Sequence, residues 1–130
     1  MRVYLCGPIN ACNDDQATTW REWFKRCSGL PAVFVDPMKR DYRGKEQIDY
    51  REIVDLDKRD IRSCDFVVVM YSKPSVGTSM EVFYAWTLGI AVIVIDKSSD
   101  LLSPWLRYHA TAIVTTKGAA VEKLAQWTEV

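Results

Sequence analysis

The chain has 130 residues, of which 48% are hydrophobic and 26% charged, which is enough for one well-packed domain and too short for two. Seventeen basic residues balance seventeen acidic ones, and no run of Lys or Arg exceeds two, which argues against a nucleic-acid surface that works by neutralising phosphates. The sequence contains no recognisable signal peptide and no stretch near the roughly 18 apolar residues of a membrane span. We therefore expect a single cytoplasmic domain over residues 1–130 that binds a small molecule or a protein and neither nucleic acid nor a membrane.

Short apolar runs alternate with helical segments along the chain. The apolar runs cover residues 2–7, 32–37, 65–71, 91–97 and 111–116, and the helical segments cover 18–27, 46–64, 79–89 and 119–130. Continuous Val-rich and Ile-rich runs, such as Phe66 to Met70, are typical of parallel strands covered on both faces. The alternation predicts an α/β fold, a three-layer α/β/α sandwich around a flavodoxin-like or Rossmann-like sheet of about five parallel strands.

Open parallel sheets bind ligands beyond the carboxyl ends of their strands. We therefore expect the site in the loops that follow Leu5, Met70 and Ile95. The polar stretch from Met38 to Gln47 has no periodicity and carries Gly44, so it is predicted to be a loop. It either covers the pocket or is a solvated connector.

Cysteines and the histidine show no pattern of metal ligands. Cys6, Cys12, Cys27 and Cys64 include no C-x-x-C pair, and His109 has no Cys or His at ligand spacing. We expect reduced thiols, no metal ion and no cofactor. The aromatic residues Trp20, Trp23 and Phe24 recur at helical spacing and are predicted to lie in the core or at a subunit contact.

Two aspartates fall on the expected buried face of the helix from about Gln47 to Cys64. Helical spacing puts Ile53, Leu56, Ile61 and Cys64 on one stripe that should face the sheet. Asp57 and Asp60 lie within this stripe, where a carboxylate is either neutralised by a partner or kept for chemistry that needs a shifted pKa. The functional interpretation is favoured for Asp57, and the structural one for Asp60 and for Asp65, which precedes the next strand.

The stretch SVGTSMEVFYA places one carboxylate, Glu81, among small hydroxyls and apolar side chains. The nearest other charges in sequence are Lys73 and Asp96, so Glu81 is predicted to be partly buried, which is costly for a carboxylate. Gly77 permits close backbone approach, and the free N–H groups at a helix start favour a phosphate. The hydroxyls of Ser75, Thr78 and Ser79 are candidates to hold it or to cap the helix.

These segments, taken in order, resemble the nucleoside 2-deoxyribosyltransferase superfamily. The resemblance runs from Val3 to about Arg107 and rests on VYLCGPI, on Asp57 eight residues before Asp65, on DFVVVMYSKPSVGTSME and on VFYAWTLGIAVIVI. It implies that Glu81 is a nucleophile that attacks the anomeric carbon and forms a covalent glycosyl-enzyme, with net retention of configuration. The resemblance also implies that Asp57 acts as acid or base at the leaving base and that Tyr4 orients the nucleophile.

The resemblance covers both transferases and hydrolases. Transferases resemble one another in an aspartate where Ser75 stands and an asparagine from a neighbouring subunit, whereas nucleoside 5'-monophosphate N-glycosidases use serines at both places to hold the phosphate. Ser75 and Ser103, in LLSPW, therefore favour the hydrolase and imply at least a homodimer in which Ser103, beside Trp105 and Tyr108, reaches the neighbouring site. The other expected substrate-binding residues are Gly7, Ile9, Asn10 and Gly77.

One departure concerns the positive charge for the phosphate. The hydrolases carry a serine and an arginine where this chain has Pro8 and Asn10, so Lys73 or Arg107 is the expected substitute. The prediction is hydrolysis of (deoxy)nucleoside 5'-monophosphates, with base exchange on 2'-deoxynucleosides as the alternative. A binding module that senses a nucleotide without turnover is a third possibility, although it would not need both acids. The sequence does not fix the base or the sugar.

Overall fold

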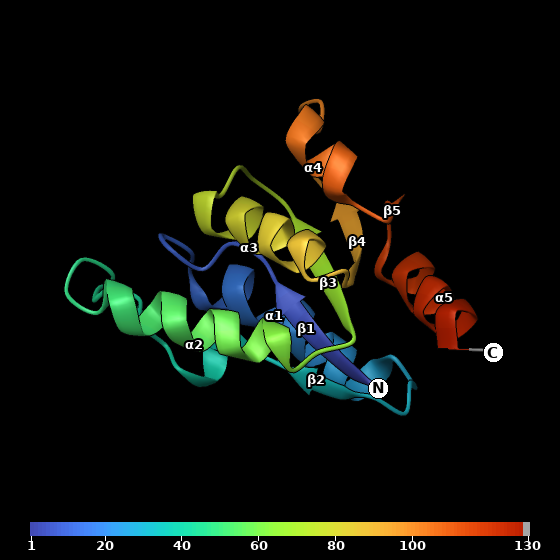
Figure 1. Ribbon diagram of the computed structural model, residues 1–130, viewed down its shortest axis with the longest axis horizontal. Helices are drawn as coiled ribbons and strands as arrows, with labels where there is room; N and C mark the ends of the chain where they lie inside the picture. Colours follow the sequence, from blue (N-terminus) through green and yellow to red (C-terminus); the bar gives the residue numbers. More distant parts are fainter. Residues whose placement is uncertain (129–130) are drawn as a thin grey trace.

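The computed structural model describes residues 1–128 and contains a five-stranded sheet whose strands run in the order β2-β1-β3-β4-β5, with every pairing parallel (Figure 1). The strands are β1 (Arg2–Cys6), β2 (Val33–Val35), β3 (Phe66–Tyr71), β4 (Ala91–Asp96) and β5 (Ala112–Val114). From β1 the chain passes outward to β2 and then returns to β3 on the other side of β1. The strand order therefore reverses between β1 and β3, which is where open sheets of this kind bind ligands.

Helices cover both faces of the sheet, which confirms the predicted α/β fold. They are α1 (Asp14–Cys27), α2 (Tyr50–Arg62), α3 (Val76–Thr87), α4 (Pro104–His109) and α5 (Lys117–Thr128), with a short 3-10 helix, η1 (Pro37–Lys39). Helices α2, α3 and α4 lie on one face and α1 and α5 on the other (Figure 1). Helix α4 was not predicted, because its six residues are too few to show a helical period.

Alternation along the central strands divides the core into two clusters. Tyr4, Cys6, Val67 and Val69 pack towards α2 and α3. Val3, Leu5, Val68 and Met70 pack with α1 and α5. Trp20 and Phe24 belong to this second cluster and Trp23 packs against it, so their predicted core role is confirmed. The period of two along β1 thus turns the Tyr4 side chain towards the face that carries Glu81 and Asp57.

Local sequence explains the helices beside the site. Asn13 and Gln16 form a capping box at the start of α1, which satisfies two backbone N–H groups. On α2 the predicted stripe is confirmed, since Ile61 and Cys64 are buried and Ile53 and Leu56 are partly buried. The neighbouring Asp55, Lys58, Arg59 and Arg62 are exposed.

Asp65 has the structural role expected of it, with a different partner. Its Oδ2 accepts a hydrogen bond from the Arg2 backbone N–H at 2.8 Å, across to β1, and not from a local backbone group. All four cysteines lie within the described residues and are free thiols. In residues 1–128, no helix is both long and apolar enough to cross a membrane.

Candidate active site

A pocket of about 150 Å³ lies where β1 and β3 end. Its lining comes from the loop after β1, the segment after β2, helix α2 and the start of α3: Gly7, Ile9, Asn10, Pro37, Arg40, Tyr42, Arg43, Glu46, Ile53, Asp57, Ser75, Gly77, Thr78 and Glu81. A groove of about 490 Å³ between α2 and α3 shares Ile53, Asp57, Gly77 and Glu81 with the pocket. The loop after β4 supplies none of the lining, so the expectation that it would hold part of this pocket was wrong. The physical reason is that β3 separates β4 from the reversal point.

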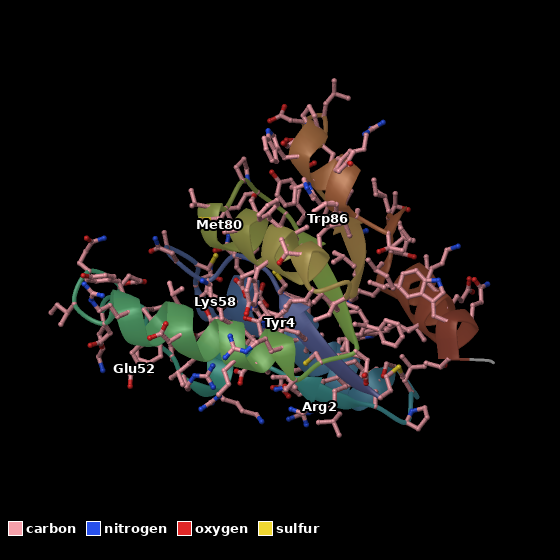
Figure 2. All side chains as sticks on the ribbon, in the orientation of Figure 1. Arg2, Tyr4, Glu52, Lys58, Met80 and Trp86 are labelled. Carbon is pink, nitrogen blue, oxygen red and sulfur yellow. The ribbon has the colours of Figure 1, made fainter. Side chains whose placement is uncertain are left out.

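Glu81 lies on the second turn of α3 and contacts Tyr4. The Tyr4 hydroxyl donates a hydrogen bond to Glu81 Oε2, and Figure 2 shows Tyr4 between α2 and α3, which carry the labelled Lys58 and Met80. Burial and the nearby Glu81 raise the pKa of Tyr4 well above 10, so the phenol remains a donor. Burial, followed by repulsion from Asp57, raises the pKa of Glu81 to about 8, against the lowering effects of the Tyr4 bond and of Arg21.

Asp57 faces the same pocket from α2. Burial is the main cause that raises its pKa to about 6, while Arg40 lowers it and Asp60 raises it. Because Glu81 and Asp57 repel each other, their protonation is coupled and the two values belong to the pair. Between about pH 6 and about pH 8 the pair therefore carries one proton in the empty site.

The segment after β2 covers the pocket. Arg40, Tyr42, Arg43 and Glu46 all line it, which supports the covering interpretation of the predicted loop. Arg43 ties the loop to the start of α1 by pairing with Asp14 at 2.7 Å, and within the loop it pairs with Asp41 at 2.6 Å. Lys73 and Arg107 do not line the pocket. The positive charges that line this chain's own pocket are therefore Arg40 and Arg43. Arg107 lies on α4 with Ser103, and the expectation that Lys73 or Arg107 supplies the charge for the phosphate stays a prediction.

Asp60 has the structural role expected of it. Arg40 Nη2 donates to Asp60 Oδ2 at 2.6 Å and lies 3.5 Å from Asp57 Oδ1. Asp60 therefore anchors the arginine that contacts Asp57. No sequence pattern indicates this pair, because twenty residues separate Arg40 from Asp60.

The start of α3 points polar groups at the pocket. Ser75 caps the helix, with its Oγ accepting from the Thr78 N–H at 3.3 Å. The Thr78 hydroxyl is buried and has no hydrogen-bond partner among the described residues. Ser79 instead donates its hydroxyl to the Ser75 carbonyl at 2.9 Å and does not line the pocket. An unpaired buried hydroxyl is uncommon in a folded protein and calls for a partner.

A buried arginine supports the loop after β1. Arg21 on α1 is fully buried, donates to the Gly7 carbonyl at 3.1 Å and lies 3.6 Å from Asp36. A Cβ at Gly7 would meet Trp20 Cζ2 at 2.8 Å, so this approach requires glycine. Sequence reasoning missed Arg21, because an arginine on an amphipathic helix normally belongs to its polar face.

The structure brings most of the predicted site residues together. Gly7, Ile9, Asn10, Ser75 and Gly77 line the pocket with both acids, and Tyr4 reaches it through Glu81. Ser103 does not line the pocket of its own chain; its Oγ accepts from the Trp105 N–H at the start of α4. The roles of these residues in catalysis and binding stay predictions.

The chemistry available here is that of two carboxyl groups and a phenol. Within residues 1–128 no group of three or more His, Cys, Asp or Glu side chains is placed to hold a metal ion. A carboxylate in a poorly solvated pocket can attack an electrophilic carbon, and a second carboxyl group that holds a proton can deliver it to a leaving group.

Comparison with known proteins gives both a family and a fold. A sequence profile of the nucleoside 2-deoxyribosyltransferase family matches residues 3–126. The chain is similar in structure to a 2-deoxyribosyltransferase of Bacillus psychrosaccharolyticus, with a TM-score of 0.73, 17% identity, and coverage of 94% of this chain and 90% of the other. It is also similar to the CMP N-glycosidase of Clostridium botulinum, with a TM-score of 0.58, 17% identity, and coverage of 98% and 99%. A search of curated proteins found no match.

Proposed function

Because the chain belongs to the nucleoside 2-deoxyribosyltransferase family, a family of enzymes, we propose that it hydrolyses the N-glycosidic bond of (deoxy)nucleoside 5'-monophosphates. The products are the free base and (deoxy)ribose 5-phosphate. The observation that carries this proposal is the start of α3, where Ser75, Gly77 and the unpartnered Thr78 hydroxyl line the same pocket as Glu81. We also propose that residues 1–130 act as one catalytic domain.

The phosphate is expected at this helix start. Backbone N–H groups at a helix N-terminus and the helix dipole both favour an anion. The Thr78 hydroxyl would gain the hydrogen-bond partner that it lacks in the described residues. Arg43 adds positive charge to the same pocket, which a phosphate-bearing substrate would use and a nucleoside would not.

Bond cleavage then follows from the two acids. In the reactive form Glu81 is ionised and Asp57 holds the proton of the pair. A Glu81 oxygen attacks C1' of the sugar, the bond to the base nitrogen breaks with its electron pair going to the base, and Asp57 donates its proton there. The Asp57 carboxylate next removes a proton from water, which attacks C1' and releases Glu81. Two displacements give net retention of configuration at C1'.

The hydrogen bond from Tyr4 and the burial of Glu81 both support the role of Glu81 as the nucleophile. The Tyr4 hydroxyl holds Glu81 Oε2, which fixes the direction of the carboxylate. Burial also removes water that would have to reorganise as positive charge develops on the sugar. In the empty site burial raises the pKa of Glu81 more than that of Asp57, which favours the shared proton on Glu81, whereas the reactive form requires it on Asp57. A bound phosphate would not by itself move the proton from Glu81 to Asp57, since its negative charge raises the pKa values of both carboxyl groups.

Transfer of deoxyribose between bases is the second candidate. The groove between α2 and α3 meets the pocket at Asp57 and Glu81, which leaves room for an acceptor base beside the glycosyl-enzyme. A base in that position would attack C1' in place of water.

We further propose a homodimer or higher homo-oligomer in which Ser103 completes the neighbouring site. Ser103 stands at the start of α4, whose Trp105 and Tyr108 are 70% and 72% exposed. Phe83 and Trp86 on α3 are also exposed, and Trp86 packs against Tyr108, so these side chains form one contiguous apolar patch. Contiguous patches of this kind, unlike scattered apolar side chains, mark interaction surfaces. Light scattering gives the mass in solution.

Mixing two inactive variants, Glu81→Gln and Ser103→Ala, would test the role of Ser103. Neither Glu81→Gln nor Ser103→Ala should turn over a monophosphate well. If Ser103 acts across the interface, a mixed dimer has one intact site, and mixing restores activity. Failure of an exchanged mixture to regain activity would contradict the shared site.

The direct test of the proposed function is release of free base from nucleosides and their 5'-monophosphates, followed by chromatography with and without a second base. Release from monophosphates without an acceptor is the expected result. New nucleosides that form only with the acceptor would establish the transferase. Binding without release, in wild type as in Glu81→Ala, would establish a binding module.

A further inference from the structure

Arg40 is held at the pocket by an acid that does not line it. Its Nη2 donates to Asp60 Oδ2 at 2.6 Å, and the two side chains are 24% and 14% exposed. The same nitrogen lies 3.5 Å from Asp57 Oδ1, which is too long for a good hydrogen bond. Asp60 therefore holds the guanidinium beside Asp57, and Asp57 remains free to form a hydrogen bond with a substrate.

Most of the donors of Arg40 remain available. A guanidinium has five N–H donors, and among the described residues only Nη2 of Arg40 donates a hydrogen bond. Arg40 and Asp57 both line the pocket. The side chain of Arg40 thus presents unused donors beside the carboxyl group that, in the proposed function, protonates the leaving base.

We infer that Arg40 makes the site selective for nucleotides of pyrimidine bases that carry a carbonyl oxygen beside the glycosidic nitrogen, such as cytosine and uracil. This inference rests on the proposed function, because it takes Asp57 as the proton donor to the base. Arg40 Nη2 has a second N–H besides the one that it donates to Asp60, and it lies 3.5 Å from Asp57 Oδ1. When Asp57 holds the proton, this N–H and the Asp57 O–H can converge on a single acceptor atom. The acceptor that suits them is an oxygen with two lone pairs.

Pyrimidine and purine bases differ in this respect. In cytosine and uracil the carbonyl oxygen at C2 is bonded to the carbon next to the glycosidic nitrogen, and it accepts from Arg40 and Asp57 together. As the bond to the sugar breaks, negative charge develops on this oxygen, so both hydrogen bonds strengthen. A purine offers ring nitrogens near its glycosidic nitrogen, each with one lone pair, so only one of the two donors can be used.

The experiment compares kcat/KM for base release from CMP, UMP, AMP and GMP. Wild type is expected to favour the pyrimidine nucleotides, and Arg40→Met should lower their kcat/KM by about ten- to a hundredfold, the range for a hydrogen bond to a charged group. Purine values should change much less, so that the selectivity ratio collapses. Arg40→Lys keeps the charge without the planar fork and is expected to lose most of the selectivity as well.

Arg59→Met is the matched control. Arg59 lies 3.6 Å from the other oxygen of Asp60, but its side chain is 60% exposed and does not line the pocket. This variant should keep the wild-type ratio of kcat/KM on pyrimidine nucleotides to kcat/KM on purine nucleotides. The inference would be overturned if both Arg40 variants lose kcat/KM equally on pyrimidine and purine nucleotides, or if the wild type prefers purine nucleotides.

Failure of the proposed function can be told apart from failure of this inference. If wild type releases no base from any monophosphate, the proposed hydrolysis is wrong. Equilibrium binding of CMP and AMP to Glu81→Gln and to Glu81→Gln with Arg40→Met then decides the inference on its own. Tighter binding of CMP that is lost with Arg40 supports it, and equal binding of both nucleotides by the Arg40-containing protein overturns it.

Discussion

Replacing Glu81 with glutamine should stabilise the folded protein, and the gain should grow with pH. In the folded chain the pKa of Glu81 is raised to about 8, mainly by burial, compared with 4.5 for a solvated glutamate. The folded state therefore holds the proton more tightly than the unfolded state. Stability from this group is fully present below about pH 4.5 and is lost progressively as pH rises towards about 8. Glutamine keeps an acceptor for the Tyr4 hydroxyl and has no proton to lose.

The magnitude follows from the size of the shift. One pKa unit corresponds to about 1.4 kcal/mol, so wild type should lose roughly 3 kcal/mol more than Glu81→Gln between pH 5 and pH 8. Solvent access to the partly buried Glu81 and its coupling to Asp57 both reduce this difference. Even half of it would be a large part of the stability of a small domain.

Urea unfolding of both proteins at pH 5 and pH 8 measures this difference. Groups that titrate away from the pocket cancel when the two changes are subtracted, whereas Asp57, which is coupled to Glu81, contributes to the difference. Glu122→Gln, an exposed position on α5, makes the same chemical change away from the pocket and should leave the free energy of unfolding within about 0.5 kcal/mol at both pH values. A gain for Glu81→Gln that is no greater at pH 8 than at pH 5 would refute the claim that Glu81 is held as a buried acid.

Three further predictions concern activity. The value of kcat/KM should be bell-shaped, with its maximum between about pH 6 and about pH 8, because the reactive pair carries one proton; a flat profile over pH 5 to 9 would contradict this. Asp57→Asn should lower kcat by on the order of a hundredfold or more, and the steady-state rate of base release measures it. Ser75→Ala and Thr78→Val should each raise KM for monophosphates while sparing nucleosides; equal effects on both substrates would remove the phosphate site from the start of α3.

The fold could be predicted from the sequence where a period repeats. Val-rich runs identified the strands, and the stripe on α2 identified the face that carries Asp57 and Asp60. The position of Glu81, far in sequence from other charges, by itself indicated a partly buried carboxylate, which the structure confirms. Each of these signals is local, because it depends on residues within one or two turns of a helix or along one strand.

Features that depend on distant contacts could not be predicted in this way. Arg40 and Arg43 come from a loop without periodicity, and their places depend on Asp60 and Asp14. The side chain of Arg21 occupies a buried position that a polar helix face does not indicate. The loop after β4 was expected at the pocket because sequence shows strand order along the chain but not across the sheet.

Trapping the glycosyl-enzyme would show whether Glu81 is the nucleophile. A 2'-deoxy-2'-fluoro nucleoside 5'-monophosphate should react slowly, since fluorine at C2' destabilises the positive charge that develops on the sugar. Mass spectrometry of the intact protein and of its peptides should then find one fluorinated sugar phosphate on Glu81, and none on Glu81→Gln. A covalent role for Glu81 would be contradicted if the base is released from this compound as fast as from the unfluorinated monophosphate, no adduct forms at any time, and the configuration at C1' is inverted.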